Sequence, residues 1–326
     1  MTPHPMGRKK ERIDDLARSG STAVLERTDE AGAVKDSEGV SLLASAWRRL
    51  RRNPMFLFGL AIVAIFLFVA IFAPLLARHN PGTQYLISQV TPNTPIPPAQ
   101  PGFPLGGDDQ GRDLLSRLIW GSRQTLMVGV GATIAGLLGG LILGTLAGAL
   151  GGWVDSVVMR IVDVMLSVPS LLLAVSVAVL FGQASQWTVI LAIGIAQVPI
   201  FARLLRGSML AQRGSDHVLA ARALGVRERS IVFRHMLPNS LGPVLVQATM
   251  VVATSIIDAA ALSFLGLGNP DDSSPEWGQM LGNSEQFIDT YPHMAFYPAI
   301  CIIVVALGFT LVGESLREAL DPKSRR

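Results

Sequence analysis

Long apolar runs alternate with polar loops from about residue 55 to the end of this chain. Six runs meet or approach the roughly 20 residues that a helix needs to cross about 30 Å of hydrocarbon. They are Met55–Ala77, Gln124–Leu150, Val157–Phe181, Trp187–Leu205, Leu241–Leu267 and Met294–Val312. The pattern predicts an all-α integral membrane protein with six transmembrane helices and both termini on the same side.

Lys and Arg residues are distributed unequally between the two sides of the predicted membrane protein. Arginines precede the first span and recur through residues 203–239. Of the 27 Lys and Arg residues, only Arg78, Arg112, Arg117 and Arg123 would lie on the other side, which leaves 27 − 4 = 23. Because cytoplasmic loops carry the excess of Lys and Arg, we expect both termini and the 203–239 loop in the cytoplasm.

Composition narrows the class of protein. Hydrophobic residues make up 50% of the 326-residue chain and charged residues 16%, which is typical of a multi-pass membrane protein. The net charge of +3 gives no reason to expect a nucleic-acid partner, and a single cysteine, Cys301, excludes a disulfide framework within the chain. The first apolar run is too long for the core of a cleavable signal peptide, so we expect it to act as a signal anchor.

The N-terminal 50 residues differ from the rest. Residues 1–40 are rich in charge and contain no Phe, Trp or Tyr, which predicts a cytoplasmic tail that is disordered in isolation. Residues 41–50, which include Trp47, predict an interfacial helix on anionic lipid head groups. We therefore expect four regions: the tail 1–40, an interfacial and first-span region 41–123, a core permease region 124–315 and a cytoplasmic tail 316–326.

Small residues recur at a fixed spacing in the second predicted span. Five glycines stand four residues apart: Gly136, Gly140, Gly144, Gly148 and Gly152. Glycine at this spacing lets a neighbouring helix approach to backbone contact. The pattern predicts a tightly packed helix, whose partner lies either in this chain or in a second subunit.

Charged residues inside the predicted spans are candidates for structural or transport roles. Arg160 and Asp163 stand three residues apart near the start of the third span, so we expect them to neutralise each other. Asp258 lies deep in the fifth span, where an ionised group is costly unless it faces water or a partner. Two roles stay open for Asp258: it faces a translocation path, or it pairs with another subunit.

A polar, basic insertion between two predicted spans has the sequence DHVLAARALGVRERSIVFRHMLPN, residues 216–239. Asp216–Leu224 predicts a short helix, and Gly225 stands where the chain needs a positive φ. Val226–Leu237 predicts a second short helix that Pro238 ends. A helix–turn–helix held at the membrane surface by flanking spans is suited to docking another protein.

This insertion resembles the EAA loop of ATP-binding-cassette importer permeases, the element that fits into a groove on the ATPase subunit. The resemblance implies a coupling loop over residues 206–239, with Leu219 in place of the Glu of the motif. The residues that it assigns to coupling are Asp216, Ala220, Ala221, Arg222, Gly225, Arg234, His235, Pro238 and Asn239.

Three other segments are similar to the dipeptide and oligopeptide permeases of that class. Residues 106–117 follow the signature Gly-Thr-Asp-x-x-Gly-Arg-Asp-x-x-Ser-Arg, with Gly107 in place of Thr. Residues 262–268, LSFLGLG, and 316–322, LREALDP, also match. In the family a Glu is expected where this chain has Ala259, so the carboxylate of Asp258 departs from the pattern by one residue.

Periodicity within the first of these segments makes a separate prediction. Residues 108–119 have one apolar face, which predicts an amphipathic helix lying on the membrane surface. Asp108 or Asp109 would cap this helix, and Arg117 would point away from its apolar face.

The resemblance implies a type I importer transmembrane domain, with this chain as the second of two homologous permeases in a bacterial plasma membrane. The expected partners are the other permease, one or two ATP-binding-cassette ATPase subunits, an extracytoplasmic substrate-binding protein and membrane lipid. ATP and magnesium would bind to the ATPase subunits, and we expect no cofactor or metal in this chain. The implied substrate is a di- or oligopeptide, with nickel, glutathione and oligosaccharide as alternatives.

Catalytic motifs are absent from the sequence, which contains no phosphate-binding loop, His-Glu-x-x-His, Cys-x-x-Cys or Gly-x-Ser-x-Gly. We therefore expect no enzyme activity. An ion-coupled secondary transporter is the alternative from a different class, but that mechanism would use more intramembrane charges and internal repeats. The acidic residues of 268–293 lack calcium-loop spacing, so we expect a solvated acidic rim, with part of this segment packed as a short helix.

Overall fold

The computed structural model describes residues 47–320 and divides the chain into two compact units, 1–48 and 49–326. The helices from α3 to α13 all belong to the second unit. The predicted tail 1–40, most of the predicted interfacial helix 41–50 and residues 321–326 lie outside the described residues.

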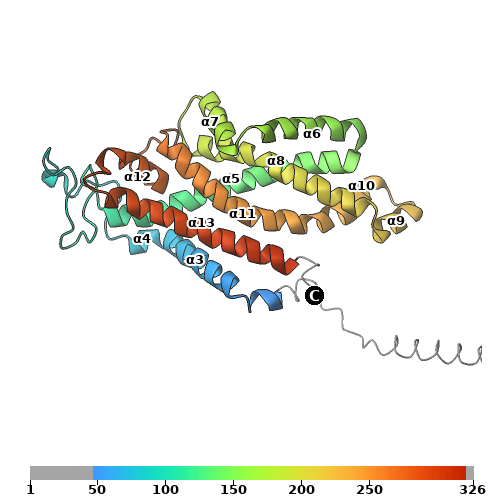
Figure 1. Cartoon of the computed structure of the whole chain (residues 1–326), viewed down its shortest axis with the longest axis horizontal. Coiled ribbons are helices and arrows are strands. Elements are labelled where there is room, and N and C mark those ends of the chain that lie inside the picture. Colours follow the sequence, from blue (N-terminus) through green and yellow to red (C-terminus); the bar gives the residue numbers. More distant parts are fainter. Residues whose placement is uncertain (1–46, 321–326) are drawn as a thin grey trace, which may run out of the picture. The chain divides into compact units, whose positions relative to one another are not determined.

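Five helices of the described residues are long and apolar enough to cross a membrane. They are α3 (Pro54–Ile71), α5 (Leu114–Leu150), α8 (Gln186–Arg213), α13 (His293–Leu320) and the helical run Glu228–Phe264. That run comprises α10 (Glu228–Ile231), a π-helical segment (Val232–Met236) and α11 (Leu237–Phe264). Figure 1 shows α9 (Asp216–Ala223) and α10 at the opposite end of the helices from α12 (Trp277–Asn283). The predicted all-α, multi-span fold is confirmed, and the boundary expected at residue 315 falls inside α13.

The third predicted span, Val157–Phe181, is not one continuous helix. It consists of α6 (Gly152–Ser167) and α7 (Ser170–Phe181), which meet at 99°. Pro169 lies at the break, where it has no amide hydrogen to donate and forces the preceding Val168 into an extended conformation with ψ of 132°. The two helices make a sixth span if they cross the membrane as one broken element.

Helices α5 and α8 pack at backbone distance along the glycine repeat. A Cβ added to Gly140 would lie 2.2 Å from the Cβ of Phe201. Three more glycines on this face would also meet α8, at 2.9, 2.8 and 2.9 Å: Gly136, Gly144 and Gly148. The packing partner is therefore in the same chain. Gly152 is the exception, because it begins α6 with a φ of 53° and its added Cβ would meet no atom within 4 Å.

The surface helix predicted at 108–119 is wrong. Helix α5 already begins at Leu114, so the boundary expected at residue 123 falls inside it, and both Leu114 and Leu118 are buried. Asp113 caps this helix in place of Asp108 or Asp109, because its side chain accepts a hydrogen bond from the amide of Ser116.

Arg117 is fully buried rather than directed away from the apolar face. Its Nε lies 3.2 Å from Oδ2 of Asp108, and the same oxygen accepts from Nε of Arg112 at 2.7 Å. Both guanidinium groups also donate to the carbonyl oxygen of Asp272. These acceptors offset the cost of burying the two cations. Helical periodicity could not show this arrangement, because one acceptor comes from a loop 155 residues further along the chain.

The segment between α11 and α13 contains the short helix expected there, α12, followed by a turn of 3₁₀ helix at Glu285–Phe287. The expected solvated rim is wrong for Glu276, which is buried. Its Oε2 accepts a hydrogen bond from Ser263 at 2.5 Å, while its Oε1 has no partner among the described residues. Burial raises the pKa of Glu276 to about 7. The neighbouring Trp277 is also buried and donates from Nε1 to the carbonyl of Leu118.

Candidate functional site

The turn between α9 and α10 has the geometry of a Schellman motif. The amide of Gly225 donates to the carbonyl of Arg222, and the amide of Val226 donates to the carbonyl of Ala221. Gly225 has a φ of 73°, the left-handed conformation expected from the sequence. The turn ends α9 and directs the chain into α10.

The second helix does not end at Pro238. The chain passes from α10 through the π-helical segment into α11 without a break, and Pro238 lies in the first turn of α11. In the π-helical segment hydrogen bonds reach one residue further back, as the amide of Leu237 shows by donating to Val232. Pro238 has no amide hydrogen to donate, so the helix continues through it with one backbone hydrogen bond fewer.

Helix α9 buries one face against its own chain and exposes another. Val218 and Ala221 are buried in a cluster with residues of α8 and the π-helical segment. Ala221 therefore packs against its own chain, and its assigned role in coupling stays a prediction. The exposed face instead carries Ala220 and two leucines, Leu219 and Leu224, which are 51% and 83% exposed. Neither leucine is among the expected coupling residues, although exposed leucines at a loop tip are typical of a contact surface.

Arg222 holds the turn closed. Its guanidinium donates to both carboxylate oxygens of Glu228, at 2.7 and 3.3 Å, and to the carbonyl of Arg213 at 3.4 Å. The carboxylate of Glu228 raises the pKa of Arg222 above its usual range. Glu228 lies outside the expected coupling set, but its position six residues after Arg222 across a glycine turn is a usable signal for such a pair.

The first turn of α9 contacts the first turn of α11. Nε2 of His217 lies 3.3 Å from Nδ2 of Asn239, and the rings of His217 and His235 are 6.4 Å apart between centroids. Asp216 begins α9, with Ser215 as its N-cap residue, while Arg234 is exposed. The expected coupling residues thus gather in one compact element, but only some of them face outward.

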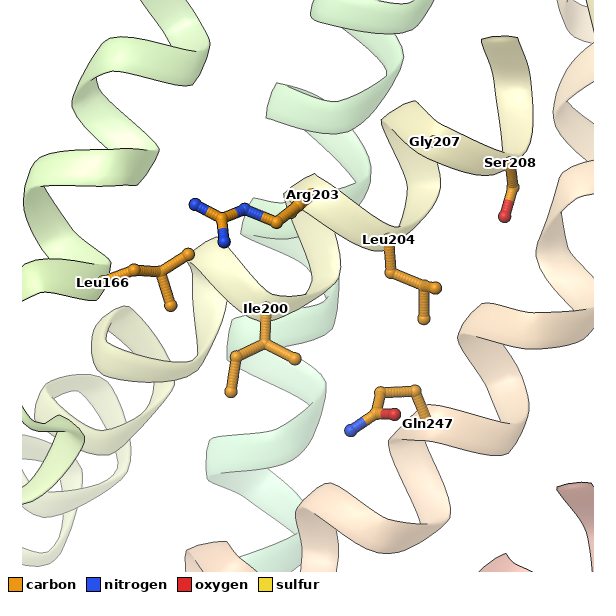
Figure 2. Close-up of a pocket in the computed structure, with 7 residues that line it drawn as sticks. All are labelled: Leu166, Ile200, Arg203, Leu204, Gly207, Ser208 and Gln247. Carbon is orange, nitrogen blue, oxygen red and sulfur yellow. The ribbon is translucent and has the colours of Figure 1, made fainter. Parts of the chain in front are cut away.

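A groove lies between α6, α8 and α11, with a volume of about 630 Å³. It is lined by Leu166, Ile200, Arg203, Leu204, Gly207, Ser208 and Gln247, and we call it the α8–α11 groove. Figure 2 shows the side chain of Arg203 directed towards Leu166, and Gln247 reaching from α11 towards α8. Its lining is mostly apolar with a few polar groups, as in many small-molecule sites.

An ion pair joins α6 to α8 beside this groove. Nη2 of Arg203 donates to Oδ1 of Asp163 at 2.5 Å, and both side chains are 56% exposed. The predicted pair between Arg160 and Asp163 is therefore wrong. The long arginine side chain of a packed neighbouring helix supplies the charge, which spacing along one helix could not reveal.

Asp258 lies on the face of α11 that contacts α8. Nε2 of Gln197 donates to its Oδ2 at 3.3 Å, and Gln197 is itself buried, with Oε1 unpartnered within the described part of the chain. Ser255, which precedes Asp258 by three residues on the same helix, accepts a hydrogen bond from the hydroxyl of Thr133 at 3.3 Å. Asp258 and Gln247 are 258 − 247 = 11 residues apart, about three helical turns, so both lie on the same side of α11.

No group of three or more His, Cys, Asp or Glu side chains within residues 47–320 is arranged to hold a metal ion. The candidate site consists of a docking element and a groove.

Comparisons with known proteins agree with this arrangement. A family model described as "Binding-protein-dependent transport system inner membrane component" matches residues 140–326. A second model, described as "N-terminal TM domain of oligopeptide transport permease C", matches residues 41–98. A solved structure of the MetNI methionine ABC transporter in inward-facing conformations superposes with a TM-score of 0.51 at 22% identity, covering 63% of this chain and 96% of that one.

Curated relatives align along most of the chain. The dipeptide transport system permease protein DppC of Alkalihalophilus pseudofirmus is 41% identical over 88% of this chain and 91% of its own. The di/tripeptide permease protein DppC of Pseudomonas aeruginosa is 38% identical over 87% and 93%, and the glutathione permease protein GsiD of Escherichia coli is 39% identical over 85% and 89%. The chain has the fold of a type I importer transmembrane domain, and it belongs to the family of inner membrane components of binding-protein-dependent transport systems, as a non-catalytic permease subunit.

Proposed function

We propose that this chain forms half of the translocation pore of an ATP-driven importer and that the importer carries di- or oligopeptides. The observation that supports coupling is the exposed leucine pair, Leu219 and Leu224, on a turn fixed by Gly225 and by the Arg222–Glu228 pair. Fully burying a leucine contributes about 1.5–3 kcal/mol, so this surface is suited to a groove on an ATPase subunit.

The proposed topology follows from charge. Both termini and the 206–239 coupling loop lie in the cytoplasm of a bacterial cell, because 23 of 27 Lys and Arg residues fall on that side. The loop then faces ATP and magnesium, which the partner ATPase subunits bind. A homologous permease completes the pore, and an extracytoplasmic binding protein delivers substrate.

The proposed path runs along the α8–α11 groove to Asp258. Gln247 lines the groove, and Asp258 lies on the same side of α11, about 16 Å further along the helix axis. A carboxylate on this path is suited to the amino group of a peptide. Closure of the ATPase pair would move the coupling loop, and the helices that bound the groove would tilt with it.

Relatives named for peptide transport support a peptide substrate, and a relative named for glutathione transport keeps that tripeptide as the main alternative. The test is the complete complex in liposomes, supplied with its binding protein and each of four labelled substrates: a dipeptide, glutathione, nickel and an oligosaccharide. We expect ATP-dependent accumulation of the dipeptide. Accumulation that needs a proton gradient but no ATP would instead identify a secondary transporter.

A further inference from the structure

A second cavity, of about 690 Å³, opens between the C-terminal end of α5 and the helical run that begins with α10. We call it the arginine cavity. Its apolar wall carries Leu146, Leu150 and Phe233, which are 42%, 63% and 62% exposed. Its polar wall carries Arg213, Arg222 and Arg229. Apolar and cationic surfaces therefore meet in one opening at the end of a membrane span.

Positive charge in the arginine cavity exceeds negative charge. Glu228 is the carboxylate in its lining, and Arg222 occupies both of its oxygens. Arg213 donates to the carbonyl of Ala149 at 2.6 Å, but neither Arg213 nor Arg229 forms an ion pair with a carboxylate in the described part of the chain. Three arginines against one glutamate leave a net charge of 3 − 1 = +2 in the lining.

We propose that the arginine cavity binds the head group of an anionic phospholipid of the cytoplasmic leaflet. Guanidinium groups bind phosphate oxygens through charge-assisted hydrogen bonds, and basic pockets at the cytoplasmic ends of spans are suited to anionic head groups. The part of the acyl chain nearest the head group then packs against Leu146, Leu150 and Phe233. This assignment rests on the cytoplasmic placement of the coupling loop proposed above.

An acidic segment of an ATPase subunit is the competing occupant. It would neutralise the arginines, but it would leave the exposed wall at Leu146 and Leu150 uncovered. A phospholipid matches both walls, because its phosphate and its acyl chain are joined at the depth where α5 leaves the membrane. The geometry therefore favours lipid.

Lipid in this cavity would tie the coupling loop to the membrane. Arg222 and Arg229 stand on either side of the Gly225 turn, while Leu146 and Leu150 belong to α5. One phospholipid therefore bridges a span and the docking element.

Photo-crosslinking in the complete complex tests the proposal. The two permeases and their ATPase subunits are placed in phosphatidylcholine nanodiscs that contain either photoactivatable phosphatidylglycerol or photoactivatable phosphatidylcholine, and crosslinked peptides are mapped by mass spectrometry. We expect the anionic lipid to label peptides containing residues 145–150 or 229–233 in several-fold excess. Arg229→Gln should lower this labelling roughly fivefold, since one arginine near the surface contributes about 1 kcal/mol.

Two control variants distinguish loss of lipid binding from a change in the structure of the loop. Arg229→Lys keeps the charge and should label nearly as the wild type does. Arg227→Gln removes an exposed arginine from the same turn that does not line the cavity, so labelling should not change.

Four results would overturn the proposal. The first is equal labelling of the cavity peptides by the two lipids, and the second is an equal loss of labelling in Arg227→Gln and Arg229→Gln. The third is loss of labelling when inorganic phosphate is added. The fourth is labelling that is seen only after the ATPase subunits are removed. The last result would assign the cavity to the ATPase, and the third to a free anion.

Discussion

Gly140 of α5 lies directly against Phe201 of α8, so closely that a Cβ on the glycine would be 2.2 Å from the Cβ of the phenylalanine. No side chain fits at that distance, and the two helices can approach this closely only because α5 presents hydrogen atoms there. The contact lies within α5 and α8, away from the ends of both helices. It therefore fixes the position of one helix relative to the other along most of their length.

Gly140→Ala should therefore destabilise the protein by about 1–3 kcal/mol through overpacking. The measurement is the thermal stability of the purified complex in detergent. Gly207→Ala is the matched control, because it adds the same methyl group to α8 at a position where no neighbouring element lies within 4 Å. That control should be neutral or slightly stabilising, since alanine favours helix by up to about 1 kcal/mol over glycine. Equal stability of the two variants would contradict the packing account.

Replacement of Gly225 tests the turn of the coupling loop. Gly225→Val should abolish uptake while the protein still reaches the membrane, because a β-branched residue at a φ of 73° costs about 1–3 kcal/mol and opens the turn. Gly225→Asn should retain more uptake, because Asn tolerates the left-handed region. Gly214→Val serves as the control, since Gly214 has a φ of −93° and open space around it. Normal uptake and ATPase binding in Gly225→Val would show that the turn is not required.

Neutralising Asp258 separates its two possible roles. Asp258→Asn keeps the size of the side chain and an oxygen that can accept from Gln197. If the carboxylate faces the path, uptake should fall while the yield of intact complex stays normal. A lower yield would indicate that Asp258 pairs with the sister permease, where a buried partner charge left alone costs about 3–5 kcal/mol. Wild-type values of both quantities would exclude both roles.

The buried Glu276 should make stability depend on pH. Its pKa in the folded protein is about 7, above the ordinary value of 4.5, so the folded state holds this proton more tightly than the unfolded state. Stability from this group is therefore full below about pH 4.5, falls as the pH rises, and is lost above about pH 7. Glu276→Gln should flatten this part of the thermal-stability profile, whereas Glu285→Gln, at an exposed site, should not. An unchanged slope in Glu276→Gln would refute the assignment.

Membrane topology is tested with single cysteines in a Cys301→Ser background. Arg227→Cys and Leu320→Cys should react with an impermeant maleimide only after the cytoplasmic side is opened, and Thr290→Cys should react in intact cells. All three native side chains are exposed or partly exposed, so accessibility within the chain does not limit the reaction. Labelling of Thr290→Cys only from the cytoplasm would invalidate the orientation.

Periodicity in the sequence predicted the spans well because burial in lipid depends on long apolar runs. Periodicity gave the wrong prediction where one residue, or a partner far away in the sequence, determines the backbone path or the burial of a side chain. Pro169 breaks a run that is apolar on both sides, and Arg117 looks solvent-facing until the carbonyl of Asp272 is placed beside it. In the coupling loop, the sequence located Gly225 and its positive φ, but it could not tell the buried Ala221 from the exposed Ala220. Which side of a short helix is covered depends on neighbours that come from α8.

The unbroken helical run from Glu228 to Phe264 has a mechanical consequence. Asp258 stands 258 − 228 = 30 residues from its first residue, about 45 Å along the axis of a straight helix. A hinge at Pro238 would let the docking end swivel while the distant carboxylate stayed still. With no break there, we expect the run to move as one lever, so that a tilt of a few degrees at its coupling-loop end would displace Asp258 by several ångströms. The π-helical segment Val232–Met236 lies between Glu228 and Asp258. We therefore expect substitutions in this segment to change how rigidly the run transmits motion.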